Sequence, residues 1–359
     1  MANPIDALIA SINRKQKETV LVRGAELKHL TFQRATTGAL AFDIALGGGW
    51  PLNCWNEVIG NESAGKTVMV LKTIAANQAL NPEYHTLWVA SEDFNMAWAE
   101  ELGIDIDRVT FVMTNVMENA YDAVLSVLAE RAVDAVVIDS FRALVPSDEE
   151  DRNMMELTVG RGAYITNKFM RKSLSASRRS LTEDDRPCLG LFINQWRDRI
   201  GAIGHSDPRI TPGGKGKNYT FMTRVDVARE EWIANTTTKL KVGQAIKIRT
   251  VKNKTAPPQR TASVDFYFDD YRTHPVGSYD DLKQVWTIGT AADIIELSGS
   301  WYSFDGTKWQ GEKAAIAALA ADPLMVAAIT AQIRHFMLKE PMPEPVEQPR
   351  KRRVARKAP

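Results

Sequence analysis

The sequence predicts an α/β fold with a mostly parallel twisted sheet flanked by helices, and two observations support this class. Short, largely apolar runs at Cys54–Ile59, Ala135–Ile138 and Leu189–Ile193 are typical of strands buried on both faces. Segments with helical periodicity, Val68–Leu80 and Glu118–Arg131, lie between these runs. Because strands and helices alternate, we expect a parallel sheet with helices packed on both of its sides.

Composition and length limit the classes that this chain can belong to. Its 359 residues can form one large or two modest domains, and 44% hydrophobic with 25% charged residues is typical of a globular protein. No apolar run reaches the roughly 18 residues that cross a membrane, and the N-terminus lacks the features of a signal peptide. Two cysteines and five scattered histidines predict no metal cluster and fit a reducing compartment, so we expect a cytoplasmic protein.

The elements follow one another in an order that separates four regions. The first, 1–33, contains a short helix at Pro4–Lys17 that is either a free arm or a docking helix. The second, 34–272, holds the alternating elements and ends in strands that predict an antiparallel extension of the sheet. The third, 273–338, is expected to be a small α+β domain with a hairpin near 299–306. The fourth, 339–359, is rich in proline and charge and is expected to be disordered.

The loop after the first buried strand matches G-x-x-x-x-G-K-[ST], the phosphate-binding pattern of nucleoside triphosphatases. It consists of Gly60, Asn61, Glu62, Ser63, Ala64, Gly65, Lys66 and Thr67. Glycine lets backbone N–H groups surround a phosphate, and the following helix adds a partial positive charge. Lys66 is expected to reach the β- and γ-phosphates, and the Thr67 hydroxyl to bind Mg²⁺.

Polar residues end three other strands of the predicted sheet, and the ends of parallel strands converge on one crevice. Asp139 is expected to hold the Mg²⁺ shell through water. Glu92 is expected to polarise the attacking water, although an acid here can instead cap a helix, a task that suits Asp93. Gln195 is expected to sense the γ-phosphate, or is simply a polar strand end.

Two basic segments each allow two interpretations when taken alone. The stretch 196–217 has no helix or strand pattern and is rich in glycine and basic residues. Such a loop suits contact with a single-stranded nucleic acid backbone, and a flexible surface loop is the alternative. Lys252 and Lys254 end a strand and suit a triphosphate, although two solvated lysines at a sheet edge are the usual explanation.

The order of these motifs resembles the RecA family of homologous recombinases, from bacteria and from phages, over roughly 36–334. The most specific matches are Phe192–Gln195 and Val251–Lys254, supported by Thr37–Gly47 and Gly213–Gly214. The resemblance implies a RecA-like P-loop ATPase core with an N-terminal polymerisation helix and a small C-terminal domain. It implies ATP and Mg²⁺ as cofactors, filaments on single-stranded DNA, pairing with homologous double-stranded DNA, strand exchange and DNA-stimulated ATP hydrolysis. Single-strand-binding and loader proteins are further candidate partners.

The resemblance also assigns roles to single residues. Lys66, Glu92 and Gln195 would be catalytic, while Asn95 and Trp98 would contact the base. Lys252 and Lys254 would reach the ATP of the neighbouring subunit, which reverses their interpretation as surface lysines. Two DNA loops would span about 147–160 and 196–212, with Val159 and Ile200 inserted between bases. The implied DNA-binding residues are Val159, Arg171, Arg197, Arg199, Ile200, Gly213 and Gly214.

Several positions depart from the family pattern. Asp198 places an acid in the second loop, Tyr164 stands where the family usually has arginine, and 180–186 looks like an insertion. The tail has six basic residues among the eight of 350–357, whereas bacterial members tend to end in an acidic segment. We expect this tail to recruit DNA by neutralising phosphates, with a solubilising tail as the alternative. These departures favour a phage or mobile-element origin.

Two other functions remain open on the sequence alone. One is a hexameric helicase or other motor built on the same ATPase core. The other is a DNA-coating mediator that does not exchange strands. Intact Lys66, Thr67, Glu92 and Asp139 argue against a loss of ATP hydrolysis, but they do not distinguish strand exchange from these alternatives.

Overall fold

The structure, a computed structural model, describes residues 3–17, 19–26, 33–90, 94–140, 144–150, 160–177, 186–198 and 209–343. The predicted residues Glu92, Asp93, Val159, Arg199 and Ile200 lie outside this part of the chain, as do the basic tail and most of 180–186. The chain divides into two compact units, Met1–Asp280 and Asp281–Pro359.

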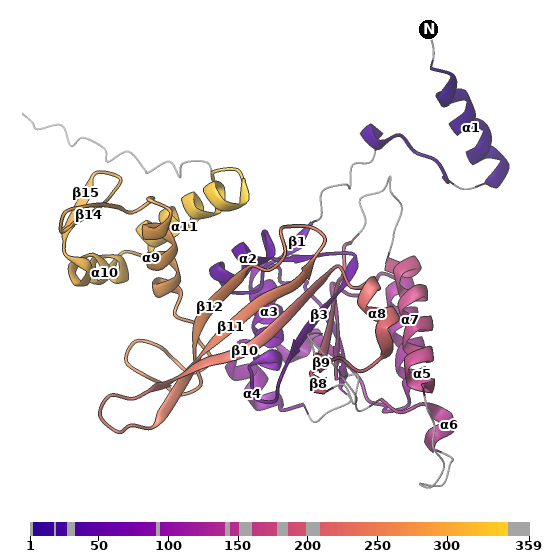
Figure 1. Cartoon of the computed structure of the whole chain (residues 1–359), viewed down its shortest axis with the longest axis horizontal. Helices are drawn as coiled ribbons and strands as arrows, with labels where there is room; N and C mark the ends of the chain where they lie inside the picture. Colours follow the sequence, from indigo (N-terminus) through magenta and orange to yellow (C-terminus); the bar gives the residue numbers. More distant parts are fainter. Residues whose placement is uncertain are drawn as a thin grey trace, which may run out of the picture. The chain divides into compact units, whose positions relative to one another are not determined.

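A large sheet forms the centre of the first unit. Its strands are β3 (Cys54–Gly60), β4 (Thr86–Ala90), β5 (Val109–Val112), β6 (Ala135–Asp139), β7 (Leu189–Gln195), β10 (Thr223–Ala234), β11 (Lys241–Asn253) and β12 (Thr261–Tyr267). Within the described residues the sheet has eight strands in the order β12-β11-β10-β3-β7-β6-β4-β5 (Figure 1). The pairs from β10 to β5 are parallel, and β11 and β12 add antiparallel strands, so the predicted extension is confirmed.

Helices and short elements complete this unit. The helices are α1 (Pro4–Gln16), α2 (Leu40–Leu46), α3 (Lys66–Leu80), α4 (Met96–Glu101), α5 (Met117–Ala129), α6 (Ser147–Glu150), α7 (Arg161–Ser177) and α8 (Gly214–Thr220), with 3-10 turns η1 (Gly24–Glu26) and η2 (Ile106–Arg108). The short strand pairs are β1 (Arg34–Ala35) with β2 (Trp50–Pro51) and β8 (Arg197–Asp198) with β9 (Arg209–Ile210). The predicted N-terminal helix is confirmed as α1.

One local prediction was wrong. The sequence predicted no helix or strand in 196–217, whereas the structure has β8, β9 and α8 there. Arg197 pairs with Ile210 and Asp198 with Arg209, so that segment returns on itself as a hairpin. The helix α8 then begins at Gly214, and its N-cap Gly213 has a φ of 93°, which is left-handed and favours glycine. The helix lies against α7, where a Cβ on Gly216 would meet Asn167 Oδ1 at 2.5 Å. Tertiary packing explains a helix that the local sequence does not predict.

Alternating side chains of the strands fill two hydrophobic cores, one on each face of the sheet. Val137 and Leu191 belong to the core that includes α2 and α3. Their neighbours Val136 and Phe192 belong to the core that includes α5 and α7. The period of two follows from the pleat of a strand, and it explains why both faces of these strands are largely apolar. Figure 1 shows α5 and α7 side by side next to the sheet.

A buried carboxylate lies inside the strand that leads to the phosphate-binding loop. Glu57 is fully buried, and its Oε1 accepts from Lys217 Nζ at 2.8 Å while its Oε2 accepts from Arg224 Nε at 2.5 Å. Asn194 Nδ2 donates to the same Oε1 at 2.9 Å, and Lys217 also donates to Thr211 Oγ1 at 2.7 Å. Desolvation of Lys217 lowers its pKa. This network joins β3, β7, β10 and the start of α8.

The second unit is smaller and has its own core. It contains α9 (Asp281–Ala291), β13 (Glu296–Ser298), β14 (Trp301–Phe304), β15 (Thr307–Gln310), α10 (Glu312–Ala321) and α11 (Pro323–Leu338). The predicted hairpin is confirmed as β14 and β15, and Trp286, Phe304, Leu319 and Ile333 are buried. Among the described helices none alone is long and apolar enough to span a membrane; α10 and α11 together satisfy length and composition, with a bend of 106° between them.

We predict that Glu57→Ala destabilises the protein strongly, because it leaves the fully buried Lys217 ammonium without its counter-ion. The free energy of unfolding should fall by about 3–5 kcal/mol, measured by urea denaturation. The control is Glu230→Ala, which breaks the exposed Lys247–Glu230 pair and should cost less than about 1 kcal/mol. Equal losses in the two variants would contradict a structural role for the network.

Candidate nucleotide-binding site

The backbone of the phosphate-binding loop is packed so closely that two of its positions require glycine. Gly65 has a left-handed φ of 97°, and a Cβ there would meet Ile246 Cδ1 at 2.9 Å. A Cβ on Gly60 would meet the Val227 carbonyl oxygen at 2.3 Å. The loop thus joins β3 to the first turn of α3 with no side chain at these points. This geometry fits a phosphate held by backbone N–H groups.

The functional side chains of the loop lie where the motif predicts. Lys66 is 8% exposed, and its Nζ donates to the Asn61 carbonyl at 2.7 Å, which places the ammonium across the loop. Thr67 Oγ1 donates to Asp139 Oδ2 at 3.4 Å. A hydroxyl and a carboxylate are oxygen donors that suit Mg²⁺. The described residues include no group of three or more His, Cys, Asp or Glu side chains that could hold a metal, so Mg²⁺ would depend on water and phosphate for its other ligands.

The strand ends converge as the parallel sheet requires. Gly60 is the register partner of Gln195, and Ala90 is the partner of Asp139. Gln195 is half-buried, and its backbone N–H donates to Asn194 Oδ1 at 3.0 Å. Glu92, which follows β4, lies outside the described residues. The structure therefore brings together Lys66, Thr67, Asp139 and Gln195 from three strand ends.

A pocket of about 340 Å³ opens beside the loop. Its lining comprises Ser63, Ala64, Gly65, Lys66, Thr67, Val68, Trp98, Trp232, Gln244, Phe266 and Phe268. Of the two predicted base contacts, Trp98 lines this pocket, whereas Asn95 caps α4 by accepting from the Trp98 N–H at 3.0 Å. Sequence reasoning did not predict Trp232, Gln244, Phe266 or Phe268. The spacing of two between Phe266 on β12 and Phe268 directly after it was the available signal.

The two predicted trans lysines lie away from this pocket. Lys252 pairs in register with Arg224, and Arg224 with Glu57, three residues before Gly60 on β3. That separation is roughly 10 Å along the strands. Lys252 Nζ donates to the carbonyls of Asn218 at 2.6 Å and Tyr219 at 3.2 Å, and Lys254 Nζ to that of Tyr219 at 3.3 Å. Burial and then the neighbouring cations lower the pKa of Lys252 to about 8.

The DNA-binding candidates among the described residues lie on α7, on β8 and at the start of α8. Arg171 is exposed on α7, and Arg197 is exposed on β8. Gly213 precedes α8, and Gly214 lies so close to α7 that a Cβ would meet that of Ala163 at 3.2 Å. The root of the hairpin is anchored, because Trp196 Nε1 donates to Asp226 Oδ1 at 2.6 Å and Arg209 stacks on the Trp196 ring at 4.6 Å.

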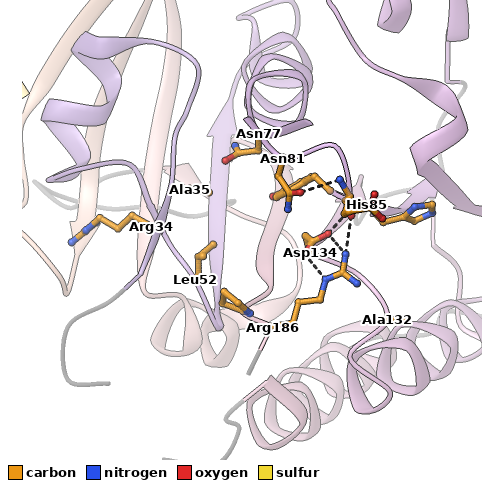
Figure 2. A pocket seen from close by; sticks show the side chains of 12 residues that line it. Arg34, Ala35, Leu52, Asn77, Asn81, His85, Ala132, Asp134 and Arg186 are labelled. Atoms are coloured by element: carbon orange, nitrogen blue, oxygen red, sulfur yellow. Dashed lines mark hydrogen bonds and ion pairs between the residues drawn. The ribbon is translucent and has the colours of Figure 1, made fainter. Parts of the chain in front are cut away.

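A second pocket, of about 500 Å³, lies near the amino ends of β4, β6 and β7, whereas the phosphate-binding loop is at their carboxyl ends. Figure 2 shows Arg186 directed at Asp134, with which it forms an ion pair, while Arg34 points elsewhere. The His85 N–H donates to the same carboxylate at 2.7 Å. This pocket shares no residue with the nucleotide site.

Fold and site together have the architecture of the P-loop nucleotide-binding class, and comparison with known proteins narrows this class. The family model of the RecA N-terminal domain matches residues 3–271, and that of the RecA C-terminal domain matches residues 284–338. The chain belongs to the RecA family, whose members act in DNA recombination and bind ATP.

Curated relatives align with this chain over more than nine tenths of its length. Protein RecA of Synechocystis sp. is 31% identical over 331 residues, which are 92% of this chain and 89% of the relative. Protein RecA of Brevibacillus brevis is 30% identical over 348 residues, 95% of this chain and 93% of the relative. Protein RecA of Bacillus subtilis is 31% identical over 337 residues, 93% and 92% of the two chains.

We predict that Gly65→Ala lowers the affinity for ATP at least about tenfold, because the new Cβ displaces the loop from Ile246. Isothermal titration measures the affinity. Gly103→Ala is the matched control: its φ of 94° brings the same backbone strain, but its Cβ would make only an ordinary contact with Ala75 at 3.5 Å. The control should lose some stability and keep its affinity; equal loss of affinity in both variants would contradict the assignment of the loop.

Proposed function

We propose that this chain is a DNA recombinase that forms filaments on single-stranded DNA with ATP and Mg²⁺, pairs the strand with homologous duplex and exchanges strands. DNA would stimulate its ATP hydrolysis. The observation that carries the proposal is the position of Gln195. It lies in register beside Gly60 at the start of the phosphate-binding loop, and β8, at the root of the second predicted DNA loop, begins at Arg197. One strand end therefore joins the two candidate sites.

This connection supports a short path from nucleotide to DNA. If Gln195 donates to the γ-phosphate, its movement also moves Trp196, the next residue. Trp196 holds the hairpin root through Asp226 and Arg209. Loss of the γ-phosphate would release Gln195 and lower DNA affinity, which resets the filament.

Each residue of the site has a proposed task in hydrolysis. Lys66 and the loop N–H groups would hold the phosphates, and Glu92 would accept a proton from the attacking water. Bound Mg²⁺, held by Thr67 and through water by Asp139, would neutralise charge that develops on the phosphate oxygens. Asn95 and Trp98 would contact the base.

The location of Lys252 and Lys254 supports a site completed by a second copy. Lys252 is level with Glu57, in the middle of β3, and Lys254 lies two residues farther from their own phosphate-binding loop. Their contact with ATP would therefore come in trans, through a head-to-tail assembly that extends as a filament. The segment 1–33 would be the polymerisation arm, 34–272 the ATPase core and 273–338 a small separate domain. The predicted DNA contacts, Val159, Arg171, Arg197, Arg199, Ile200, Gly213 and Gly214, would follow the strand within this filament.

We predict that Lys66→Ala abolishes DNA-dependent ATP hydrolysis and strand exchange, because the triphosphate loses its main cation. The readouts are phosphate release with single-stranded DNA and strand exchange against homologous and non-homologous duplexes. Lys72→Ala, on the same helix but with its Nζ on the Leu102 carbonyl, is the matched control and should stay active.

Three outcomes would contradict this proposal. Full turnover by Lys66→Ala would refute the site. Closed rings in electron microscopy would favour a helicase or motor, and DNA coating without exchange by the unaltered chain would favour a mediator.

We predict that two inactive variants restore activity to each other when mixed. One is Lys66→Ala, and the other is the double variant Lys252→Ala with Lys254→Ala. In an equal random mixture about a quarter of the interfaces pair an intact loop with intact lysines. DNA-dependent hydrolysis should therefore return to roughly a quarter of the normal rate. A mixture as inactive as its components would show that the lysines do not act across an interface.

A further inference from the structure

The hairpin formed by β10 and β11 brings a tryptophan to the nucleotide pocket that no motif predicts. Trp232 lies on β10 and lines the pocket with Gly65, Lys66 and Thr67. Its side chain remains 40% exposed, so part of the ring is accessible to a bound ligand. Cross-strand pairing puts it opposite Gln244, which is buried and lines the same pocket.

Two cations hold this ring in place. The Arg229 guanidinium lies 4.0 Å and the Lys241 ammonium 4.2 Å from the Trp232 ring centroid. A cation this close to the centroid lies over a face of the ring, so the cations occupy the faces of the indole and leave its edge for other contacts. Arg229 Nη1 also donates to the Ser63 carbonyl at 3.3 Å, which connects this group to the phosphate-binding loop.

Edge-to-face pairs organise the aromatic wall of the pocket. Trp232 meets Phe268 with centroids 6.2 Å apart and planes at 86°, and Trp98 meets Phe266 at 6.4 Å and 87°. A flat, uncharged ring such as a nucleobase fits a wall of this kind. The four aromatic rings present negative faces and positive edges, and the ring of a base can pair with both. Triphosphate alone would gain nothing from it.

We propose that Trp232 is a base-contacting residue that closes the outer side of the nucleotide pocket with its indole edge. Arg229 and Lys241 are positioning residues that act through Trp232. The inference rests on the proposed binding of ATP and adds a wall that the family resemblance does not supply.

The test compares ATP with inorganic tripolyphosphate as probes, both titrated calorimetrically against the full chain. Trp232→Ala should weaken ATP binding about tenfold and leave tripolyphosphate binding unchanged. Trp232→Phe, which keeps an aromatic wall, should retain most of the affinity and guards against a folding defect in the alanine variant. Trp301→Ala, which removes a similarly exposed tryptophan (46%) from the second unit, should change neither probe.

A double-mutant cycle tests the positioning role. Arg229→Met should weaken ATP binding in the unaltered chain but not in the Trp232→Ala background, because Arg229 acts through the ring. If Arg229→Met weakens tripolyphosphate as much as ATP, Arg229 binds phosphate and the positioning role is overturned. If the unaltered chain binds ATP and Trp232→Ala binds it equally well, the Trp232 assignment alone fails. If the unaltered chain binds neither probe, the proposed function fails with it.

Discussion

The buried carboxylate of Glu57 is the interaction on which the functional end of the sheet depends. It lies on the strand that carries the phosphate-binding loop, and it binds cations from two later parts of the chain, Lys217 and Arg224. A carboxylate in the interior is stable only when such partners are present and hydrogen-bonded. Asn194 and Thr211 supply further hydrogen bonds. The fold of 209–224 is therefore fixed by the charge on β3.

The Glu57 network also holds the residues next to Gln195 and the β9 strand. Asn194 precedes Gln195, and Thr211 follows the β9 strand of the hairpin. Both residues belong to one buried network, because Asn194 donates to Glu57 and Thr211 accepts from Lys217, the cation paired with Glu57. Replacing a buried ion pair by apolar residues is often neutral or stabilising, so we infer that this pair is kept for the position that it specifies. Here the position that matters is that of Gln195 relative to Gly60.

Much of this arrangement could be predicted from sequence, because its signals are local. The loop 60–67 and the apolar strands need only spacing and composition. Other features needed tertiary information. The helix α7 was not predicted, since its buried residues Ile165 and Phe169 lie among many polar ones. Lys217 belongs to a glycine-rich basic stretch that can be interpreted as a flexible surface loop. Its side chain is nevertheless fully buried, because it pairs with the buried Glu57. Trp232 reaches the pocket only through pairing of β10 with β11.

The separation of the two lysines from the loop of their own copy has a consequence for the number of complete sites. With the lysines serving a neighbouring copy, as proposed, a filament of n copies contains n − 1 complete sites, because one terminal copy has no donor. The rate per copy then rises with length and approaches its limit only in long filaments. A short filament would then be a poor ATPase and would keep its nucleotide at one end. The two ends are chemically different, so growth and loss of copies become directional.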